Sequence, residues 1–125
     1  MRILYGDPIP KTKPTPPEER YILEYPKESI FQSFVQQQFK NFYEKIADPW
    51  KCYHTWRSAN STGEFPDLVC THEEGGLTLA AELKTETGKV TDEQARWLRG
   101  FAANPADDTF LWFPSDIPEI TDYLQ

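Results

Sequence analysis

The chain has 125 residues, the length of a single domain, and 13 Lys and Arg against 20 Asp and Glu give it a formal net charge of −7. No apolar run approaches the roughly 18 residues that a membrane span needs, and an aromatic content of 14% is too high for a disordered chain. The acidic balance at first argues against a nucleic-acid partner, because phosphate binding rests on lysine and arginine.

The first seven residues stop being apolar too soon for a secretory signal, so we expect a cytoplasmic protein. The two cysteines, Cys52 and Cys70, are too few for a disulfide framework. In a cytoplasmic protein we expect both to be reduced thiols.

Residues 1–26 contain six of the eleven prolines and are expected to form an irregular or polyproline-like arm, separate from a domain at 27–125. Apolar residues then recur with a period near 3.6 from Ile30 to Ile46, which predicts a helix over 27–47. Pro26 suits the first turn of this helix, and Asp48-Pro49 ends the pattern.

Three strands are expected next, and a polar loop at 58–63 and a hairpin turn at 73–76 separate them. The predicted strands are 50–57, 65–72 and 77–84. A second helix is predicted from Thr91 to about Ala103, where Thr91 and Gln94 fit a capping box. A fourth strand at 109–113, a turn and a short C-terminal helix or coil complete the order α-β-β-β-α-β, a mixed α/β domain with a small sheet of about four strands flanked by helices.

Asp67, Glu82 and Lys84 are the residues that suggest chemistry. Strand parity puts Glu82 and Lys84 on one face, and Asp67 can face the same way from the neighbouring strand. Two carboxylates suit Mg²⁺ or Mn²⁺, which keep positions open for water and phosphate. Lys84 could then orient or deprotonate an attacking water, or offset charge on a phosphate, so the set could hydrolyse a phosphodiester.

These residues lie in a series of motifs whose order resembles the VRR-NUC branch of the PD-(D/E)xK nuclease superfamily. The motifs are Glu28, Phe65-Pro66-Asp67-Leu68-Val69, Glu82-Leu83-Lys84, Gly88-Lys89-Val90-Thr91 and Gln94-Ala95-Arg96-Trp97-Leu98. The stretch 54–58 also looks like the second strand of that family and 110–116 like its final strand and turn, so the resemblance covers about 27–120. The chain departs from the family pattern at Glu64, which stands between Gly63 and Phe65 and adds a carboxylate near the site.

The resemblance implies a restriction endonuclease-like core and a Mg²⁺- or Mn²⁺-dependent endonuclease without a small-molecule cofactor. Its implied substrate is branched, flapped or Holliday junction DNA in replication, recombination or repair, and its implied state is a homodimer, in a chain of phage type acting inside a host cell. The implied metal ligands are Glu28, Asp67, Glu82 and the carbonyl of Leu83; the implied catalytic residues are Asp67, Glu82, Lys84 and Gln94. The residues that we expect to bind DNA are His54, Trp56, Arg57, Ser58, Lys89 and Arg96.

Each of these residues also has a purely structural interpretation. Glu28 suits the helix dipole in a first turn, Gln94 suits a cap, and Asp67 after Pro66 suits a turn. Glu82 and Lys84 could be a solvated strand pair, although the apolar run from Leu77 to Ala81 argues against solvation.

Two further groups of residues allow other interpretations. Cys52-x-His54 and Cys70-x-His72 could meet around zinc, but their spacing is shorter than in usual zinc sites; parity also points Cys70 away from Asp67. The tryptophans at 50, 56, 97 and 112 are expected in the core, with Trp56 the best candidate to stack on an unpaired base. Asp107, Asp108 and Asp116 are expected to be solvated loop and cap residues.

The net charge is unevenly distributed. Residues 1–26 sum to zero, 27–99 to −2 and 100–125 to −5, so most of the acidic excess lies outside the predicted site. One divalent ion would neutralise the middle segment, and DNA binding would then be weak without metal and sensitive to salt. The alternative function is a non-catalytic acidic module that binds a protein, but a decayed nuclease would be expected to lack Asp67, Glu82 or Lys84.

Overall fold

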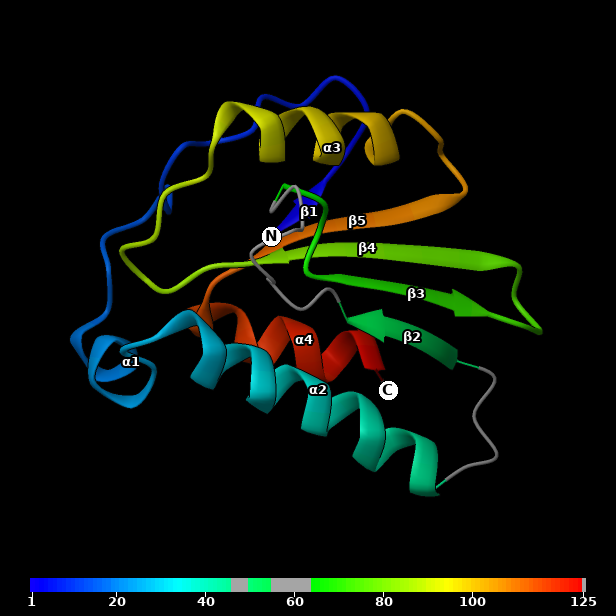
Figure 1. The fold of residues 1–125 in the computed structure, drawn as a ribbon, viewed down its shortest axis with the longest axis horizontal. Helices are drawn as coiled ribbons and strands as arrows, with labels where there is room; N and C mark the ends of the chain where they lie inside the picture. Colours follow the sequence, from blue (N-terminus) through cyan, green and yellow to red (C-terminus); the bar gives the residue numbers. More distant parts are fainter. Residues whose placement is uncertain (46–49, 55–63, 125) are drawn as a thin grey trace.

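The computed structural model describes residues 1–45, 50–54 and 64–124, with side chains at 1–40, 51–53 and 64–124. Over these residues a five-stranded mixed sheet lies between helices on both faces, which confirms the predicted fold class and adds one strand (Figure 1). The sheet has the order β1-β5-β4-β3-β2. Its strands are β1 (Arg2–Ile3), β2 (Trp50–His54), β3 (Leu68–His72), β4 (Leu77–Leu83) and β5 (Asp107–Trp112).

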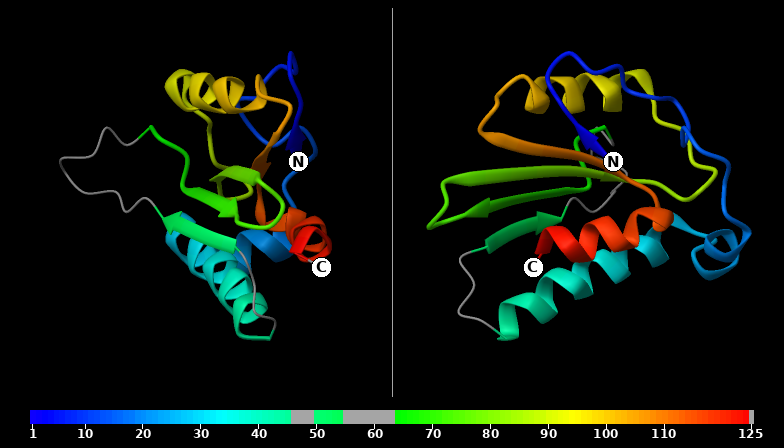
Figure 2. Two further views of the ribbon diagram at one scale, coloured as in Figure 1. Left: turned by 90° about the vertical axis from the view of Figure 1, so that its right-hand side faces the viewer. Right: turned by 180° about the vertical axis from the view of Figure 1, so that it is seen from behind.

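The helices lie on the sheet as two layers (Figure 2). One face is covered by α2 (Glu28–Lys45) and α4 (Ile117–Leu124), and the other by α3 (Asp92–Ala102). A short 3₁₀ helix, η1 (Pro114–Asp116), connects β5 to α4. In the described part of the chain, no helix is long and apolar enough to cross a bilayer.

The α2 helix forms where the apolar period predicted it. Phe31, Val35 and Phe39, spaced four residues apart, are buried against the sheet. They pack on side chains of alternate strand positions, among them Leu79 and Trp112. Alternate positions of β4 and β5 face α3, so this face of the sheet carries Glu82.

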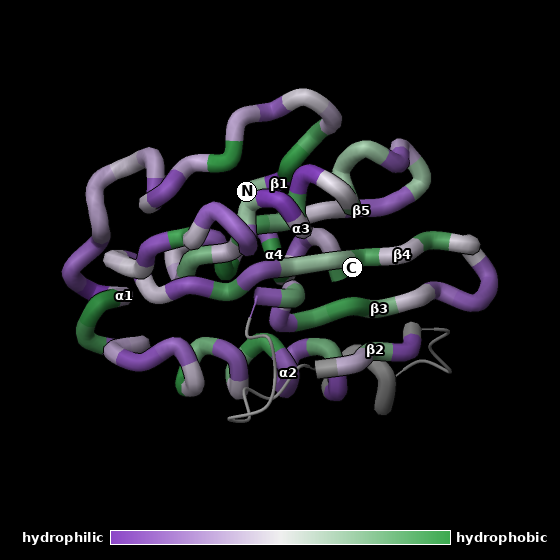
Figure 3. The backbone as a smooth tube through the Cα atoms, turned by 45° about the horizontal axis from the view of Figure 1, so that its top comes forward, coloured by the Kyte–Doolittle hydropathy of each residue, from purple (hydrophilic) through white to green (hydrophobic). Residues whose placement is uncertain are grey.

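Apolar residues predominate in the central strands β3 and β4 (Figure 3). A hydrophilic turn joins β3 and β4 as an antiparallel hairpin, where Gly76 adopts a φ of 62° and donates to the carbonyl of His72. The α3 crossover then brings β5 parallel to β4. Glu82 consequently lies in a strand with neighbours on both sides, which is why it is buried.

The N-terminal arm is more regular than expected. β1 pairs antiparallel with β5, with Arg2 opposite Phe110, and α1 (Glu19–Glu24) interrupts the proline-rich segment. Ile3 is buried in the second core cluster, on the side of α3. A two-residue strand has no detectable period, and only its partner β5 makes it a strand.

The expectation of two free thiols is wrong, because Cys52 and Cys70 form a disulfide. They are direct partners in the antiparallel pairing of β2 and β3. The bond also removes both sulfurs from the alternative zinc site, since a metal needs thiolates. As parity predicted, Cys70 faces the α2 side of the sheet, away from Glu82.

Candidate metal centre

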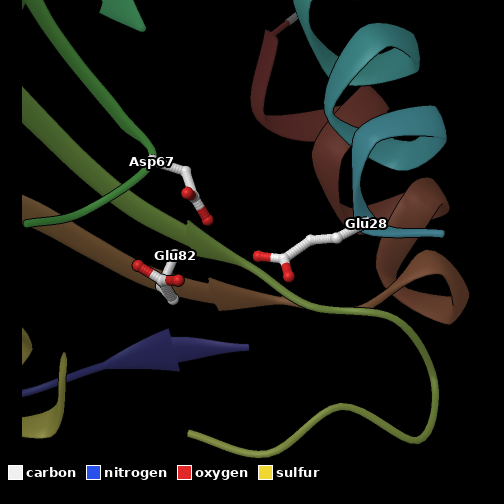
Figure 4. A group of neighbouring side chains, drawn as sticks. All are labelled: Glu28, Asp67 and Glu82. Atoms are coloured by element: carbon white, nitrogen blue, oxygen red, sulfur yellow. The ribbon is translucent and has the colours of Figure 1, made fainter. Parts of the chain in front are cut away.

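Three carboxylates from three separate elements converge at one end of the sheet (Figure 4). Glu28 is the first residue of α2, Asp67 directly precedes β3, and Glu82 lies near the end of β4. One oxygen of each lies within 4.8 Å of the others, and Asp67 and Glu82 are buried. A search of the described residues for clustered His, Cys, Asp and Glu side chains that could hold a metal ion finds these three carboxylates. Glu64 is not among them.

Asp67 is held by the strand beside it. The backbone N–H of Leu83 donates to its Oδ2 at 2.9 Å, beyond the last β3–β4 partners, Leu68 and Ala81. The carboxylate therefore occupies the place where the next ladder bond would form. This bond fixes Asp67 and the backbone of β4 relative to each other.

Gln94 completes the helix cap and also contacts Glu82, so its structural interpretation is confirmed and its catalytic role stays a prediction. Its Oε1 accepts from the N–H of Thr91 at 3.0 Å, and its own N–H donates to Thr91 Oγ1 at 3.1 Å, which completes the predicted capping box. The Nε2 group donates to Glu82 Oε1 at 3.1 Å. The first turn of α3 thereby orients Glu82.

Lys84 lies on the same face of the sheet as Glu82. Its Nζ is 3.8 Å from Glu82 Oε1, and both side chains are buried, so the solvated strand pair is excluded. Two residues apart on an extended segment share a face, as the parity argument predicted. The sequence placed Glu28, Asp67, Glu82, Lys84 and Gln94 at one site, and the structure brings all five together.

The electrostatics of the cluster favour a cation. Burial, the nearby charge of Asp67 and a hydrogen bond with Asp67 raise the pKa of Glu82 to about 10, although Lys84 opposes the shift. Without a cation, ionisation of Glu82 is therefore disfavoured. Three hard oxygen donors with a buried, unfavourable negative charge match the ligands that Mg²⁺ and Mn²⁺ prefer.

The predicted DNA-binding residues are only partly described. The side chain of His54 and all of Trp56, Arg57 and Ser58 lie outside the described residues. Lys89 and Arg96 are exposed on the loop before α3 and on α3 itself. Glu64, the departure from the family pattern, accepts a hydrogen bond from Thr91 Oγ1 beside the first turn of α3.

Glu86 was missed by the sequence reasoning. Its side chain is fully buried, and Oε1 accepts from Lys13 Nζ at 2.9 Å and from the N–H of Glu18 at 3.1 Å. Oε2 accepts from the N–H and hydroxyl of Ser115. Burial raises the pKa of Glu86, but these hydrogen bonds outweigh it and hold the pKa below the usual value. The sequence did contain a signal for a buried Glu86: it lies two residues after Lys84, soon after the apolar strand β4 ends.

Two other expectations need correction. Trp97 is 40% exposed rather than in the core, while Trp112 is fully buried as expected. Asp108 is buried in β5, where it pairs with Arg2 and accepts from the Tyr123 hydroxyl at 2.7 Å, so it is not a solvated loop residue. Asp116 does act as a cap, since its Oδ2 accepts from the N–H of Phe113 at 2.9 Å.

Comparison with known proteins gave one family. The model of the VRR-NUC domain matches residues 13–109, more than half of the chain. This match begins within the proline-rich arm, for which the motifs had suggested no counterpart. No curated protein and no solved structure matches the chain.

Proposed function

Because the chain belongs to the VRR-NUC family, a family of nucleases, we propose that it is a metal-dependent endonuclease that hydrolyses phosphodiester bonds in DNA. The observation that carries the proposal is the buried convergence of Glu28, Asp67 and Glu82 beside Lys84. A structural ion pair would not need three carboxylates for one ammonium group.

Glu28, Asp67 and Glu82 would hold Mg²⁺ or Mn²⁺, with the carbonyl of Leu83 as a further ligand. When bound, such an ion polarises a phosphoryl group and favours ionisation of water. The protein supplies the positioning: Gln94 fixes Glu82 through a hydrogen bond, and the N–H of Leu83 fixes Asp67. These contacts hold the ligands in place before any ion or DNA arrives.

Lys84 provides a cation on the same side as the carboxylates. Its Nζ, 3.8 Å from Glu82, would lie beside the scissile phosphate and offset the negative charge that develops during hydrolysis. The same ammonium group could orient the attacking water. Lys89 and Arg96, both exposed, would contact neighbouring phosphates.

The proposal extends to a homodimer that selects branched, flapped or Holliday junction DNA. The test uses duplex, single-stranded, flapped and four-way DNA of related sequence, each with Mg²⁺ or Mn²⁺. We expect cleavage of at least one form, no cleavage with chelator, and no detectable cleavage by Glu82→Gln. Glu73→Gln removes an exposed carboxylate in the hairpin turn and should leave cleavage unchanged. A wild-type protein that cuts none of these DNAs with either ion would refute the proposal.

A further inference from the structure

A groove of about 560 Å³ runs along the solvent side of α3. The groove is lined by Glu93, Arg96, Trp97, Gly100, Phe101, Asn104 and Asp107. We call this surface the α3 groove. The metal centre uses none of these side chains, and Gln94, which does contact Glu82, faces the sheet instead.

The groove presents an aromatic surface that is exposed and held in place. Trp97 is 40% exposed, yet its ring meets Phe65 edge to face with centroids 5.0 Å apart. Phe101 supports both rings, at 6.1 Å from Phe65 and 6.5 Å from Trp97. An indole ring that is held by neighbouring rings and partly open to solvent is a surface on which a planar, apolar group can stack.

The charged side chains of the lining are one guanidinium, that of Arg96, and two carboxylates, those of Glu93 and Asp107. The guanidinium of Arg96 is exposed and touches Glu93 at 3.8 Å, a weak surface pair that a phosphate could replace. Asn104 and Asp107 add polar groups at the far end of the groove. Apart from its two chain neighbours and the backbone of α3, no atom lies within 4 Å of the position that a Cβ at Gly100 would take, so a side chain there would extend into the groove.

Two residues beside or in the groove lie close in the sequence to residues of the carboxylate cluster or its contacts. Phe65 stands two residues before Asp67, and Trp97 follows Gln94 by three residues, which is about 4.5 Å along a helix axis. The loop before β3 and the first turns of α3 therefore each carry one residue of the site and one aromatic residue beside the groove. In a duplex both faces of a base are already stacked, so only an unpaired base can use this surface.

We propose that the α3 groove binds an unpaired nucleobase of the DNA strand whose phosphate lies at the carboxylate cluster. The inference rests on the proposed nuclease function and specifies its substrate, DNA that is single-stranded beside the scissile bond. Stacking on Trp97 supplies affinity without reading sequence, because every base has a π face. This gives a physical basis for selecting flapped or branched DNA over duplex.

The test measures binding without cleavage. A labelled single strand of about 12 nucleotides and the same strand in duplex are titrated, in chelator and at low salt, with wild type, Trp97→Ala and Gly100→Leu. Both variants should bind the single strand about 10-fold more weakly, and duplex within about twofold. Gly100→Leu fills the groove while replacing a helical glycine, so it should unfold no earlier than wild type.

Two controls separate the groove from other effects. Ala103→Leu adds the same side chain at an exposed position outside the groove and should bind both DNAs like wild type. In a second control, an abasic site is placed at each position of the single strand in turn. At one position, the abasic strand should bind wild type as weakly as the intact strand binds the variants. Unchanged single-strand binding by Gly100→Leu, or equal losses on both DNAs, would overturn the proposal. So would a groove variant that turns a dimer into a monomer and leaves single-strand binding intact.

The cleavage assay distinguishes the two levels of inference. If wild type cuts DNA and Gly100→Leu cuts single-stranded and duplex regions in the same ratio, the groove proposal fails and the nuclease proposal stands. If wild type cuts nothing, the nuclease proposal fails whatever the oligonucleotide binds.

Discussion

Replacing Glu82 with glutamine should stabilise the metal-free protein while abolishing metal-dependent cleavage. In the folded state burial and Asp67 raise the pKa of Glu82 to about 10, against 4.5 for an ordinary glutamate. At pH 7 the unfolded chain therefore loses a proton that the folded chain keeps, which favours unfolding. Above pH 4.5 this difference of one proton lowers the free energy of unfolding by about 1.36 kcal/mol for each pH unit. At pH 7 the loss is therefore about 3 kcal/mol.

The pH dependence gives this prediction its sign. Because the folded pKa is raised, wild type is stabilised below pH 4.5 relative to higher pH, and it loses this stability as pH rises toward 10. Glutamine cannot ionise, and its oxygen can still accept from Gln94. The difference between variant and wild type should be near zero at pH 4 and about 3 kcal/mol in favour of the variant at pH 7.

Urea unfolding in chelator, from pH 4 to pH 8, measures this difference. Glu86→Gln is the matched control, since Glu86 is also buried but has a lowered pKa. It should lose about 1–3 kcal/mol above pH 4.5, because charged hydrogen bonds weaken, and this loss should shrink on acidification. A Glu82→Gln variant no more stable than wild type at pH 7, or a gain that does not vary with pH, would refute the reasoning.

Three further outcomes are expected. Lys84→Met, which keeps the aliphatic stem, should lower the rate of DNA cleavage about 100-fold or more with an unchanged circular dichroism spectrum; wild-type rates would remove Lys84 from the mechanism. Reduction of the Cys52–Cys70 bond, which spans 18 residues, should lower the free energy of unfolding by about 3 kcal/mol, and a reductant should not alter the stability of Cys52→Ser. Thr91→Ala should cost about 1 kcal/mol in urea unfolding and weaken Mg²⁺ binding in calorimetry, because the cap that orients Gln94 is lost; unchanged Mg²⁺ affinity would show that Gln94 needs no cap.

Local rules predicted part of the candidate site, and the family resemblance added Glu28 and Gln94 to it. Glu82 and Lys84 share a face through strand parity, and Gln94 sits at a capping-box position that needs only four consecutive residues. The α2 helix was equally clear from its apolar period. Each of these inferences depends on neighbours within a few positions in the chain.

The features that escaped prediction depend on partners far away in the chain. The disulfide requires the register that sets Cys52 opposite Cys70, and no spacing rule fixes that register. β1 is a strand only because β5 lies beside it. The exposure of Trp97 follows from how Phe65 packs against α3, whereas the helical period alone placed Trp97 on the apolar side.

The hydrogen bonds of Glu86 have a consequence for how the protein matures during synthesis. This carboxylate follows the strand that carries Glu82 and Lys84, and its donors come from Lys13, Glu18 and Ser115. A nascent chain that ends before residue 115 leaves the carboxylate without its last two donors and lacks the helix that follows η1. We expect a nascent chain to complete the hydrogen bonds of Glu86 only after Ser115 has been added, so the segment that follows β4 becomes fixed only when the C-terminal part of the chain is present.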